Sequence, residues 1–355
     1  MKPLISICMP NYNYEHYIKE AIESILSQTY SNFELIIVDD ASTDNSAEII
    51  KSFNDPRIKL YQNTSNIFMF PTINKAIKQA KGDIIAVIHS DDLYEKTFLE
   101  EIVKAYNDYP DKKVFISGVN FYHSESNYKI PWHPYKTGGI KSQKEVLLVL
   151  ATYNNIGNGV NVAIQKDCIN KVGFFTETFK YIGDYDYWLR LAEEYDFVYI
   201  PKILANYRIH DSNITHSLVK DMIFFREGYE VFNKNISESK IINNKLYKKT
   251  LYIGRKKIIH TAFRTGIKYK SGKILRDILK FSKEVHPDII FEPYWYLMYL
   301  ISFLVQDNGS PQMLNLVSTL VRLMLYPQKI YINFLIEKMI NQETAGIKSK
   351  KCYEI

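Results

Sequence analysis

Cysteine is scarce in this chain of 355 residues, which contains only Cys8, Cys168 and Cys352. These residues are odd in number and far apart, so they exclude a disulfide framework and match no metal-binding cysteine spacing. A reducing compartment fits this pattern best.

Neither a secretory signal peptide nor a full membrane span is expected. The N-terminus runs directly into the apolar alternation 4–7, with no basic segment, long apolar core or cleavage site before it. The longest apolar run, 294–305, is shorter than the roughly 18–20 residues that a membrane-spanning helix needs. We therefore expect a cytoplasmic protein, for which contact with a membrane surface stays open.

The formal net charge of +6 is the sum of two oppositely charged parts. Residues 1–212 carry 22 Lys+Arg and 27 Asp+Glu, whereas residues 213–355 carry 23 and 12. Within 240–283 alone, 14 basic residues stand against one acid, Asp277. The hydrophobic fraction of 46% excludes disorder, and the length favours one large domain with a second part.

Short apolar runs alternate with helical periodicity through the first two thirds of the chain. Strands are predicted at 4–9, 33–38, 58–61, 83–88, 114–119, 160–164, 197–200 and 204–209. Helices are predicted at 17–28, 47–53, 72–80, 96–106, 143–151 and 184–193. This alternation predicts an α/β fold with a mostly parallel sheet between helices. From about residue 213 onward, the pattern is helical throughout.

Polar residues follow three of the predicted strands. They are 11–13, Asp39-Asp40 and Asp91-Asp92. In parallel sheets, ligands bind at the carboxyl ends of the strands, so these side chains are expected to meet there.

Each carboxylate has a structural alternative. Asp39-Asp40 could cap the following helix, although Ser42 or Asp44 could do so alone. Asp91-Asp92 could cap the helix at 96–106, but two adjacent carboxylates at a buried strand end also suit a hard divalent cation.

Two later segments allow both structural and catalytic interpretations. Asp184 and Asp186 could be first-turn acids that favour the helix dipole, or one could deprotonate an acceptor hydroxyl. Arg208 could pair with an acid and His210 could be a surface histidine, or either could meet phosphate or metal.

Together, these residues resemble the family 2 nucleotide-sugar glycosyltransferases with the GT-A fold. The resemblance runs from about Leu4 to Thr215. It is carried by 5–13, 24–30, 33–44, 74–85, 173–175, 183–190 and 207–210. It implies a Rossmann-like GT-A domain, with a mostly parallel mixed sheet flanked by helices, over 1–214. An all-helical C-terminal domain would follow over 215–355.

The resemblance also implies roles for individual residues. The residues implied to bind the nucleotide are Pro10, Tyr12, Asn13, Asp39, Asp40, Asn74, Asp91 and Arg208. Tyr12 would stack on the base and Asp40 would accept a hydrogen bond from a uracil N–H, so a UDP-sugar is the expected donor.

The resemblance also implies the chemistry. Asp92, Asp91 and His210 are the implied ligands of Mn²⁺ or Mg²⁺, which would stabilise the departing diphosphate. Asp184 matches the base that deprotonates the acceptor hydroxyl in an inverting single displacement. The expected acceptor is a surface glycan, either a polysaccharide or a lipid-linked oligosaccharide.

Two positions depart from the family pattern. His89 stands where many members have Asp, so metal binding could be weaker or could include His89. Gly183 stands where many have Glu, beside the implied base. These departures support an alternative, a binding or scaffold protein that kept the fold and lost the chemistry.

The basic segment 240–283 has three possible partners. An anionic membrane surface is preferred, because aromatic and apolar runs follow the basic residues. This would place the protein peripherally on the inner face of the cell membrane. Nucleic acid is the competing partner, but no recognised nucleic-acid module accompanies the segment, so no such binding is expected. Homo-oligomerisation through the helical region is the third.

Overall fold

The computed structural model describes residues 2–150, 159–210, 213, 223–242 and 272–285. The chain divides into two compact units, and the first two ranges belong to one of them. The predicted roles of domains 1–214 and 215–355 stay predictions.

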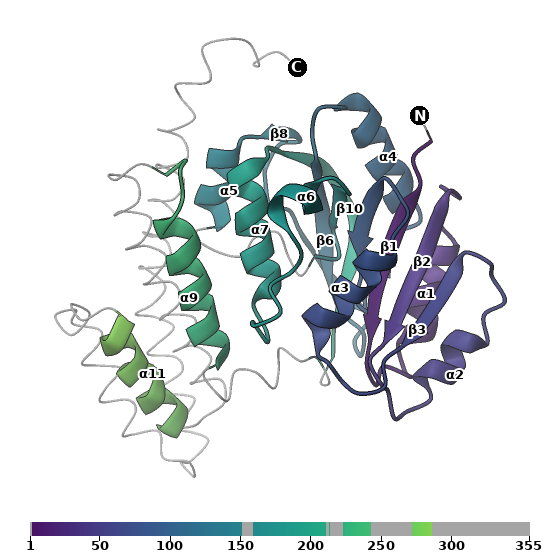
Figure 1. Cartoon of the computed structure of the whole chain (residues 1–355), viewed down its shortest axis with the longest axis horizontal. Helices are drawn as coiled ribbons and strands as arrows, with labels where there is room; N and C mark the ends of the chain where they lie inside the picture. Colours follow the sequence, from purple (N-terminus) through teal and green to yellow (C-terminus); the bar gives the residue numbers. More distant parts are fainter. Residues whose placement is uncertain (1, 151–158, 211–212, 214–222, 243–271, 286–355) are drawn as a thin grey trace. The chain divides into compact units, whose positions relative to one another are not determined.

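Within the described residues, ten strands form one sheet in the first unit (Figure 1). The strands are β1 (Ile5–Asn11), β2 (Phe33–Asp39), β3 (Ile58–Gln62), β4 (Ile84–Val87), β5 (Leu93–Tyr94), β6 (Val114–His123), β7 (Tyr128–Trp132), β8 (Gly139–Lys141), β9 (Val162–Gln165) and β10 (Phe197–Ile209). Their order is β3-β2-β1-β4-β9-β6-β10-β5, with β7 beside β6 and β8 beside β10.

The predicted α/β sheet is confirmed as a mixed sheet with a parallel half. Strands β3, β2, β1 and β4 are parallel neighbours, and β6 is parallel to β10. Strand β9 runs antiparallel to both β4 and β6, and so joins the two parallel groups.

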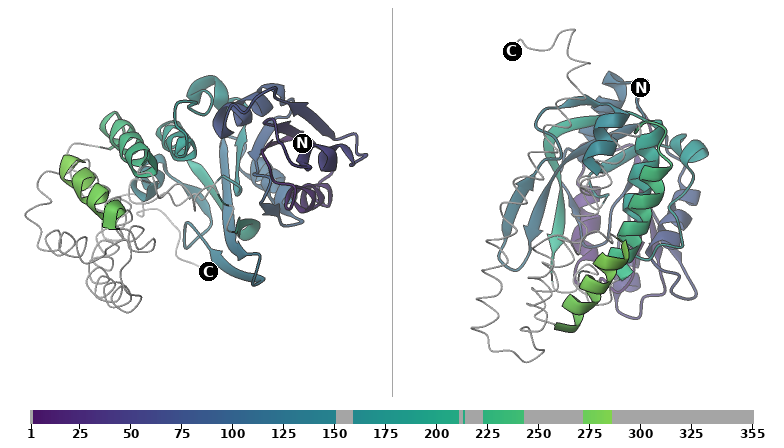
Figure 2. Two further views of the ribbon diagram at one scale, coloured as in Figure 1. Left: turned by 90° about the horizontal axis from the view of Figure 1, so that it is seen from below. Right: turned by 90° about the vertical axis from the view of Figure 1, so that its left-hand side faces the viewer.

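Helices lie on both sides of this sheet (Figures 1 and 2). The helices of the first unit are α1 (Ile18–Leu26), α2 (Ser46–Lys51), α3 (Met69–Gln79), α4 (Phe98–Asp108), α5 (Gln143–Leu150), α6 (Cys168–Val172) and α7 (Gly183–Glu194). Ile5, Ile7 and Met9 alternate along β1 and are buried in one core with apolar residues of α1, α2 and α4. Helices α3, α6 and α7 lie on the opposite face, in front of the sheet in Figure 1.

Strand β10 corrects one prediction. Residues 197–200 and 204–209 were expected to be separate strands, but they form one strand that pairs with β6 on both sides of an irregular region. The register shifts between Ile200 and Ile203 and again before Ala205. Pro201 has no N–H to donate, and a bulge tolerates it without ending the strand.

Four elements were not predicted, namely β5, β7, β8 and α6, and all of them have five residues or fewer. Cys8 and Cys168, the cysteines within the described ranges, are buried and form no disulfide, as expected.

The second unit contributes α9 (Ile223–Ser237) and α11 (Gly272–Val285) to the described residues. Tyr229 and Phe281 meet edge to face, with ring centroids 5.9 Å apart, and Arg226 lies 3.3 Å from Glu284. Both elements are helical, as predicted. Most of the basic segment 240–283 and the apolar run 294–305 lie outside the described residues. Within the described ranges, no helix is both long and apolar enough to cross a membrane.

Candidate active site

The predicted meeting of strand ends is present at the carboxyl edge of the parallel strands. Asn11, the last residue of β1, pairs in register with Asp39, the last residue of β2, and its side-chain amide donates to the Asp39 carboxylate at 2.7 Å. The Ser90 hydroxyl, beyond β4, donates to the carbonyl oxygen of Pro10 at 2.7 Å. Three strand ends are therefore joined by direct hydrogen bonds.

Asp39 and Asn13 hold the loops after β1 and β2 together. The Asp39 carboxylate accepts hydrogen bonds from the Ser42 hydroxyl at 2.6 Å and from the Ser42 N–H at 3.2 Å. Asn13 has φ of +55° and accepts the Thr43 N–H at 2.8 Å through its side-chain oxygen. Tyr12, which lies between Asn11 and Asn13 in the chain, is 43% exposed.

Asp40 is held by residues that follow β3. Its carboxylate accepts from the Asn63 side-chain amide at 2.7 Å and from the Ile67 N–H at 2.9 Å. Lys75 of α3 donates to the side-chain oxygen of Asn63 at 2.6 Å, so Asn63 bonds both Lys75 and Asp40. Asn63 was not predicted, although it carries the same signal as the others, a polar residue directly after a parallel strand.

The helix-capping alternative fails for Asp91 and Asp92. Helix α4 begins at Phe98 after Thr97, and β5 lies between the two acids and that helix. Near α2, whose N-cap residue is Asn45, the Asp44 carboxylate accepts the Ser46 N–H at 3.0 Å.

Asp92 offers a buried oxygen atom to a ligand. Its Oδ1 accepts the Arg208 N–H at 2.9 Å, whereas its Oδ2 has no hydrogen-bond partner within the described ranges. Nδ1 of His89 lies 3.9 Å from this Oδ2. His89, Asp91 and Asp92 each bring a potential ligand atom within 4.8 Å of the others.

The Asp91 carboxylate is contacted by side chains from two other segments of the chain. Nε2 of His210 lies 3.1 Å from its Oδ2, and the Tyr14 hydroxyl forms a further hydrogen bond with its side chain. The His210 ring stacks on Tyr17 with centroids 4.2 Å apart. The structure thus places His210 beside the carboxylate pair, and its implied role as a metal ligand stays a prediction.

Arg208 ties the same carboxylates to α1. Its Nε donates to the Asp91 carbonyl oxygen at 2.7 Å, and its Nη2 donates to Glu20 at 2.6 Å. Of the two interpretations given for Arg208, pairing with an acid is therefore present. Glu20 and Tyr14 were not predicted as parts of this site.

The electrostatics of the pair fit a divalent cation. Burial, and then the negative charge of Asp91, raise the pKa of Asp92 well above its usual range, against the opposing effect of Arg208. Burial lowers the pKa of His89, which favours the neutral imidazole that binds metals. Two carboxylates and an imidazole, including a buried oxygen atom that lacks a donor, form an O/N donor set suited to Mn²⁺ or Mg²⁺.

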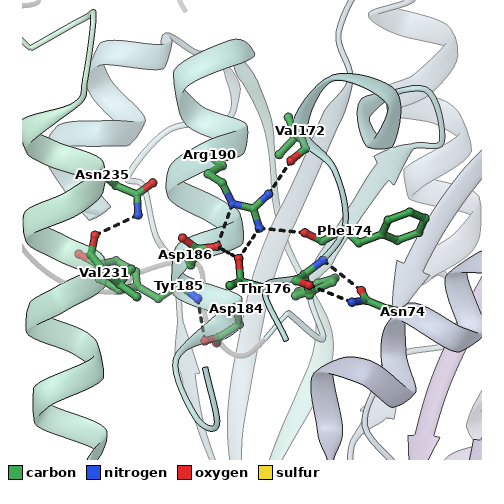
Figure 3. A network of polar contacts seen from close by, with 11 residues as sticks. Asn74, Val172, Phe174, Thr176, Asp184, Tyr185, Asp186, Arg190, Val231 and Asn235 are labelled. Atoms are coloured by element: carbon green, nitrogen blue, oxygen red, sulfur yellow. Dashed lines mark hydrogen bonds and ion pairs between the residues drawn. The ribbon is translucent and has the colours of Figure 1, made fainter. Parts of the chain in front are cut away.

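The two acids that open α7 have different surroundings (Figure 3). Asp186 is 2% exposed, lies 2.8 Å from Nε of Arg190 and accepts the Thr176 hydroxyl at 2.7 Å. Asp184 is half-buried, and its Oδ1 accepts the Tyr185 N–H at 2.7 Å. Because Asp186 is committed to an ion pair, Asp184 is the stronger candidate for a base.

Asn74 and Gly183 have structural partners that the sequence did not reveal. The Asn74 amide donates to the carbonyl oxygen of Phe175 at 2.8 Å, and its oxygen accepts the Phe175 N–H at 3.0 Å. These contacts favour a positioning role over the predicted nucleotide contact. A Cβ atom at Gly183 would lie 2.7–2.8 Å from three ring atoms of Phe70. The absence of a side chain at 183 therefore makes room for that ring.

The mixed sheet flanked by helices, with carboxylates at its strand ends, has the architecture of the GT-A fold. The sequence profile described as "Glycosyl transferase family 2" matches residues 6–172. The chain belongs to this family, which confirms the resemblance.

Two relatives illustrate the family. The UDP-Glc:alpha-D-GlcNAc-diphosphoundecaprenol beta-1,3-glucosyltransferase WfgD of Escherichia coli is 30% identical over 226 residues, 62% of this chain and 82% of WfgD. An uncharacterised glycosyltransferase of Methanocaldococcus jannaschii is 32% identical over 228 residues, 62% of this chain and 75% of the relative.

Solved structures share the fold at low sequence identity. TarS 1–349 of S. aureus, crystallised with UDP-GlcNAc, has a TM-score of 0.58 and 16% identity, covering 85% of this chain and 90% of TarS 1–349. Mannosyltransferase PcManGT of Pyrobaculum calidifontis, in complex with GDP-Man and Mn²⁺, has a TM-score of 0.56 and 17% identity, covering 99% and 89%.

Proposed function

We propose that this protein is an inverting glycosyltransferase that moves a sugar from UDP to a hydroxyl group of a surface-glycan acceptor with the help of a divalent cation. One observation carries the proposal. The buried Oδ2 of Asp92, which has no hydrogen-bond partner among the described residues, lies beside His89 and Asp91 at the edge where the strands end. A divalent cation that binds together with the diphosphate of the donor would supply the positive charge that these carboxylates need.

The donor pocket in this proposal is formed by the loops after β1, β2 and β3. Tyr12 offers an exposed ring for the base, beside Pro10, and Asp40 accepts a hydrogen bond from the base. Asp39 and Asn13 hold the loops, and Asn63 fixes Asp40. UDP is favoured as the nucleotide because WfgD is named for UDP-Glc and TarS was crystallised with UDP-GlcNAc.

The residues that would hold Mn²⁺ or Mg²⁺ are Asp92 and Asp91, with His89 or His210 as a nitrogen ligand. When bound, such a cation stabilises the negative charge of the departing diphosphate. The complex of PcManGT with Mn²⁺ supports this assignment. Arg208 keeps Asp92 and the Asp91 backbone in place.

Asp184 is the proposed base. Its carboxylate takes the proton of the acceptor hydroxyl while the oxygen of that hydroxyl attacks the anomeric carbon from the face opposite the diphosphate. A new C–O bond forms to the acceptor as the C–O bond to UDP breaks. The configuration at the anomeric carbon is therefore inverted.

The test is the release of UDP from a panel of UDP-sugars, with water as the acceptor, by the wild type, Asp184→Asn and Asp92→Asn. We expect Asp184→Asn to lose turnover by at least about 100-fold while it still binds UDP, because proton transfer contributes about 10²–10⁴. Asp92→Asn should lose UDP binding as well. Slow hydrolysis of a donor by the wild type would argue against the non-catalytic alternative, whereas UDP binding with no hydrolysis of any donor would favour it.

The surface of α11 suits the proposed docking on an anionic membrane. Its four basic residues, at 273, 276, 280 and 283, are exposed, and their spacing places them along one side of the helix. Ile278, Leu279 and Phe281 are buried, so this contact would depend on charge without insertion of these side chains. A lipid-linked acceptor, as in the name of WfgD, would require such docking.

Vesicles with and without anionic lipid test this part of the proposal, which places the protein peripherally on the inner face of the cell membrane. Retention should require anionic lipid and fall as salt rises. The variant in which Lys273, Arg276, Lys280 and Lys283 are all changed to Gln should be released. Equal retention on duplex DNA would favour nucleic acid as the partner. A mass in light scattering equal to that of one chain would exclude homo-oligomers.

A further inference from the structure

A loop between α6 and α7 is fastened to α7 by one side chain. Nη1 of Arg190 donates to the carbonyl oxygen of Val172 at 2.5 Å, and Nη2 donates to that of Phe174 at 3.0 Å (Figure 3). Nε of Arg190 donates to Asp186 at 2.8 Å, and Asp186 also accepts the Thr176 hydroxyl. The guanidinium and the carboxylate thus hold the first part of this loop, as far as Thr176, against α7.

The same loop is fastened to α3 by Asn74. The amide of Asn74 both donates to and accepts from the backbone of Phe175, and its Nδ2 also donates to Glu177 at 2.9 Å. Asn74 is 1% exposed, so these groups cannot exchange their partners for water. Without the amide, the backbone of Phe175 would lose both hydrogen bonds.

Aromatic packing adds a second connection between α3 and α7. The Phe175 ring stacks on the ring of Tyr187 of α7, with centroids 4.1 Å apart, and its centroid lies 5.9 Å from that of Phe70 of α3. The Phe70 ring also occupies the space beside Gly183, the residue before Asp184. The first turns of α7 are therefore held against α3 on both sides of Asp184.

Helix α3 is connected in turn to the donor pocket. It starts at Met69, two residues after Ile67, whose N–H donates to Asp40, and its Lys75 donates to the side chain of Asn63. A continuous chain of contacts then runs from Asp40 through α3, Asn74, the loop and Arg190 to the helix that carries Asp184.

We propose that Arg190 and Asn74 are positioning residues, which set the place of Asp184 relative to the donor without touching a reactant. This inference rests on the proposed function, in which Asp184 is the base. Transfer depends steeply on geometry, since a displacement of about 1 Å at a reacting group can cost about 100-fold in rate.

The experiment measures kcat and KM for UDP-sugar hydrolysis and the Kd of UDP in Arg190→Lys, Arg190→Ala and Asn74→Ala. We expect kcat to fall by about 10–100-fold while KM and the Kd of UDP stay within about twofold. Lysine keeps the charge opposite Asp186 but cannot reach three acceptors at once. Compared with Arg190→Ala, Arg190→Lys should therefore restore folding more than it restores kcat.

Two controls separate positioning from general damage. Glu194→Gln removes the ion pair between the last turn of α7 and Lys171 of α6, and it should leave kcat unchanged. In an Asp184→Asn background, Arg190→Lys and Asn74→Ala should cause no further loss, because the base they position is gone.

The inference is overturned if Arg190→Lys or Asn74→Ala lowers kcat further in the Asp184→Asn background. It is also overturned if the Kd of UDP rises by the same factor as kcat falls. If Arg190→Ala does not fold, Arg190→Lys and Asn74→Ala decide alone. A wild type that hydrolyses no UDP-sugar contradicts the proposed function instead, and removes the positioning role with it.

Discussion

A methyl group at Gly183 tests how tightly α7 packs on α3. The Cβ of Gly183→Ala would lie 2.7 Å from Cε2 of Phe70 and 2.8 Å from Cδ2 and Cζ. Carbon atoms in contact prefer about 3.5–4.0 Å, so the overlap is on the order of 1 Å. Phe70 is 2% exposed and packs on Phe175, and it cannot swing into solvent to relieve the overlap.

Two effects of opposite sign compete in this variant. Alanine is favoured over glycine inside a helix by up to about 1 kcal/mol. Overpacking in a filled core costs about 1–3 kcal/mol, and this should prevail because the clash is with a buried ring. In a unit of this size, each kcal/mol shifts Tm by about 2–4 °C, so we expect Tm to fall by a few degrees.

Thermal unfolding of the wild type, Gly183→Ala, Phe70→Leu and the double variant decides the point. Phe70→Leu should be destabilising by itself, because it removes buried ring contacts. Adding Gly183→Ala to Phe70→Leu should then be neutral or stabilising, since leucine leaves room for the methyl group. A Gly183→Ala protein as stable as the wild type, or a loss that is the same in both backgrounds, would refute the packing argument.

Three further variants test other parts of the structure. Burial raises the pKa of Glu34, but hydrogen bonds from Lys59 and other donors outweigh it and the net pKa is lowered, so Glu34→Gln should be less stable in urea at pH 7. That stability is lost as pH falls from about 4.3, the unfolded pKa, through the folded pKa; a difference that persists below both values would contradict the assignment. Phe68 has φ of +69° and ψ of 171°, a region nearly restricted to glycine. In urea unfolding, the free energy of unfolding of Phe68→Gly should therefore exceed that of Phe68→Ala by about 1 kcal/mol. A Phe68→Ala protein more stable than Phe68→Gly would disprove the strain. Asn63→Ala should weaken UDP binding about tenfold by releasing Asp40, and unchanged affinity in a titration would exclude this support.

The buried parallel strands were predictable because their sequence period follows from burial. The continuous apolar run of β2 and the alternation in β1 end within two residues of their predicted limits. Strand β7 carries no such signal, since Tyr128–Ile130 and Pro131 are exposed and its position depends only on pairing with β6. Pro201 suggested a break in β10, and only the partner strand shows that a bulge absorbs it.

The candidate site was predictable as far as strand ends define it. The carboxylates at 39–40 and 91–92 were identified because parallel strands end at one edge. The contacts of Tyr14, Glu20 and Asn74 could not be predicted in this way. Each depends on a partner more than 70 residues away, which local patterns do not encode.

A calorimetric titration of UDP into the wild type and Asp92→Asn, each with Mn²⁺ and with a chelator, measures whether the carboxylate pair holds a cation that binds the nucleotide. We expect Mn²⁺ to strengthen UDP binding to the wild type at least about tenfold and to leave UDP binding to Asp92→Asn unchanged, because Asp92 contributes the buried oxygen atom of the proposed cation site. Absence of UDP binding to the wild type, or an affinity that neither Mn²⁺ nor Asp92→Asn changes, would contradict it.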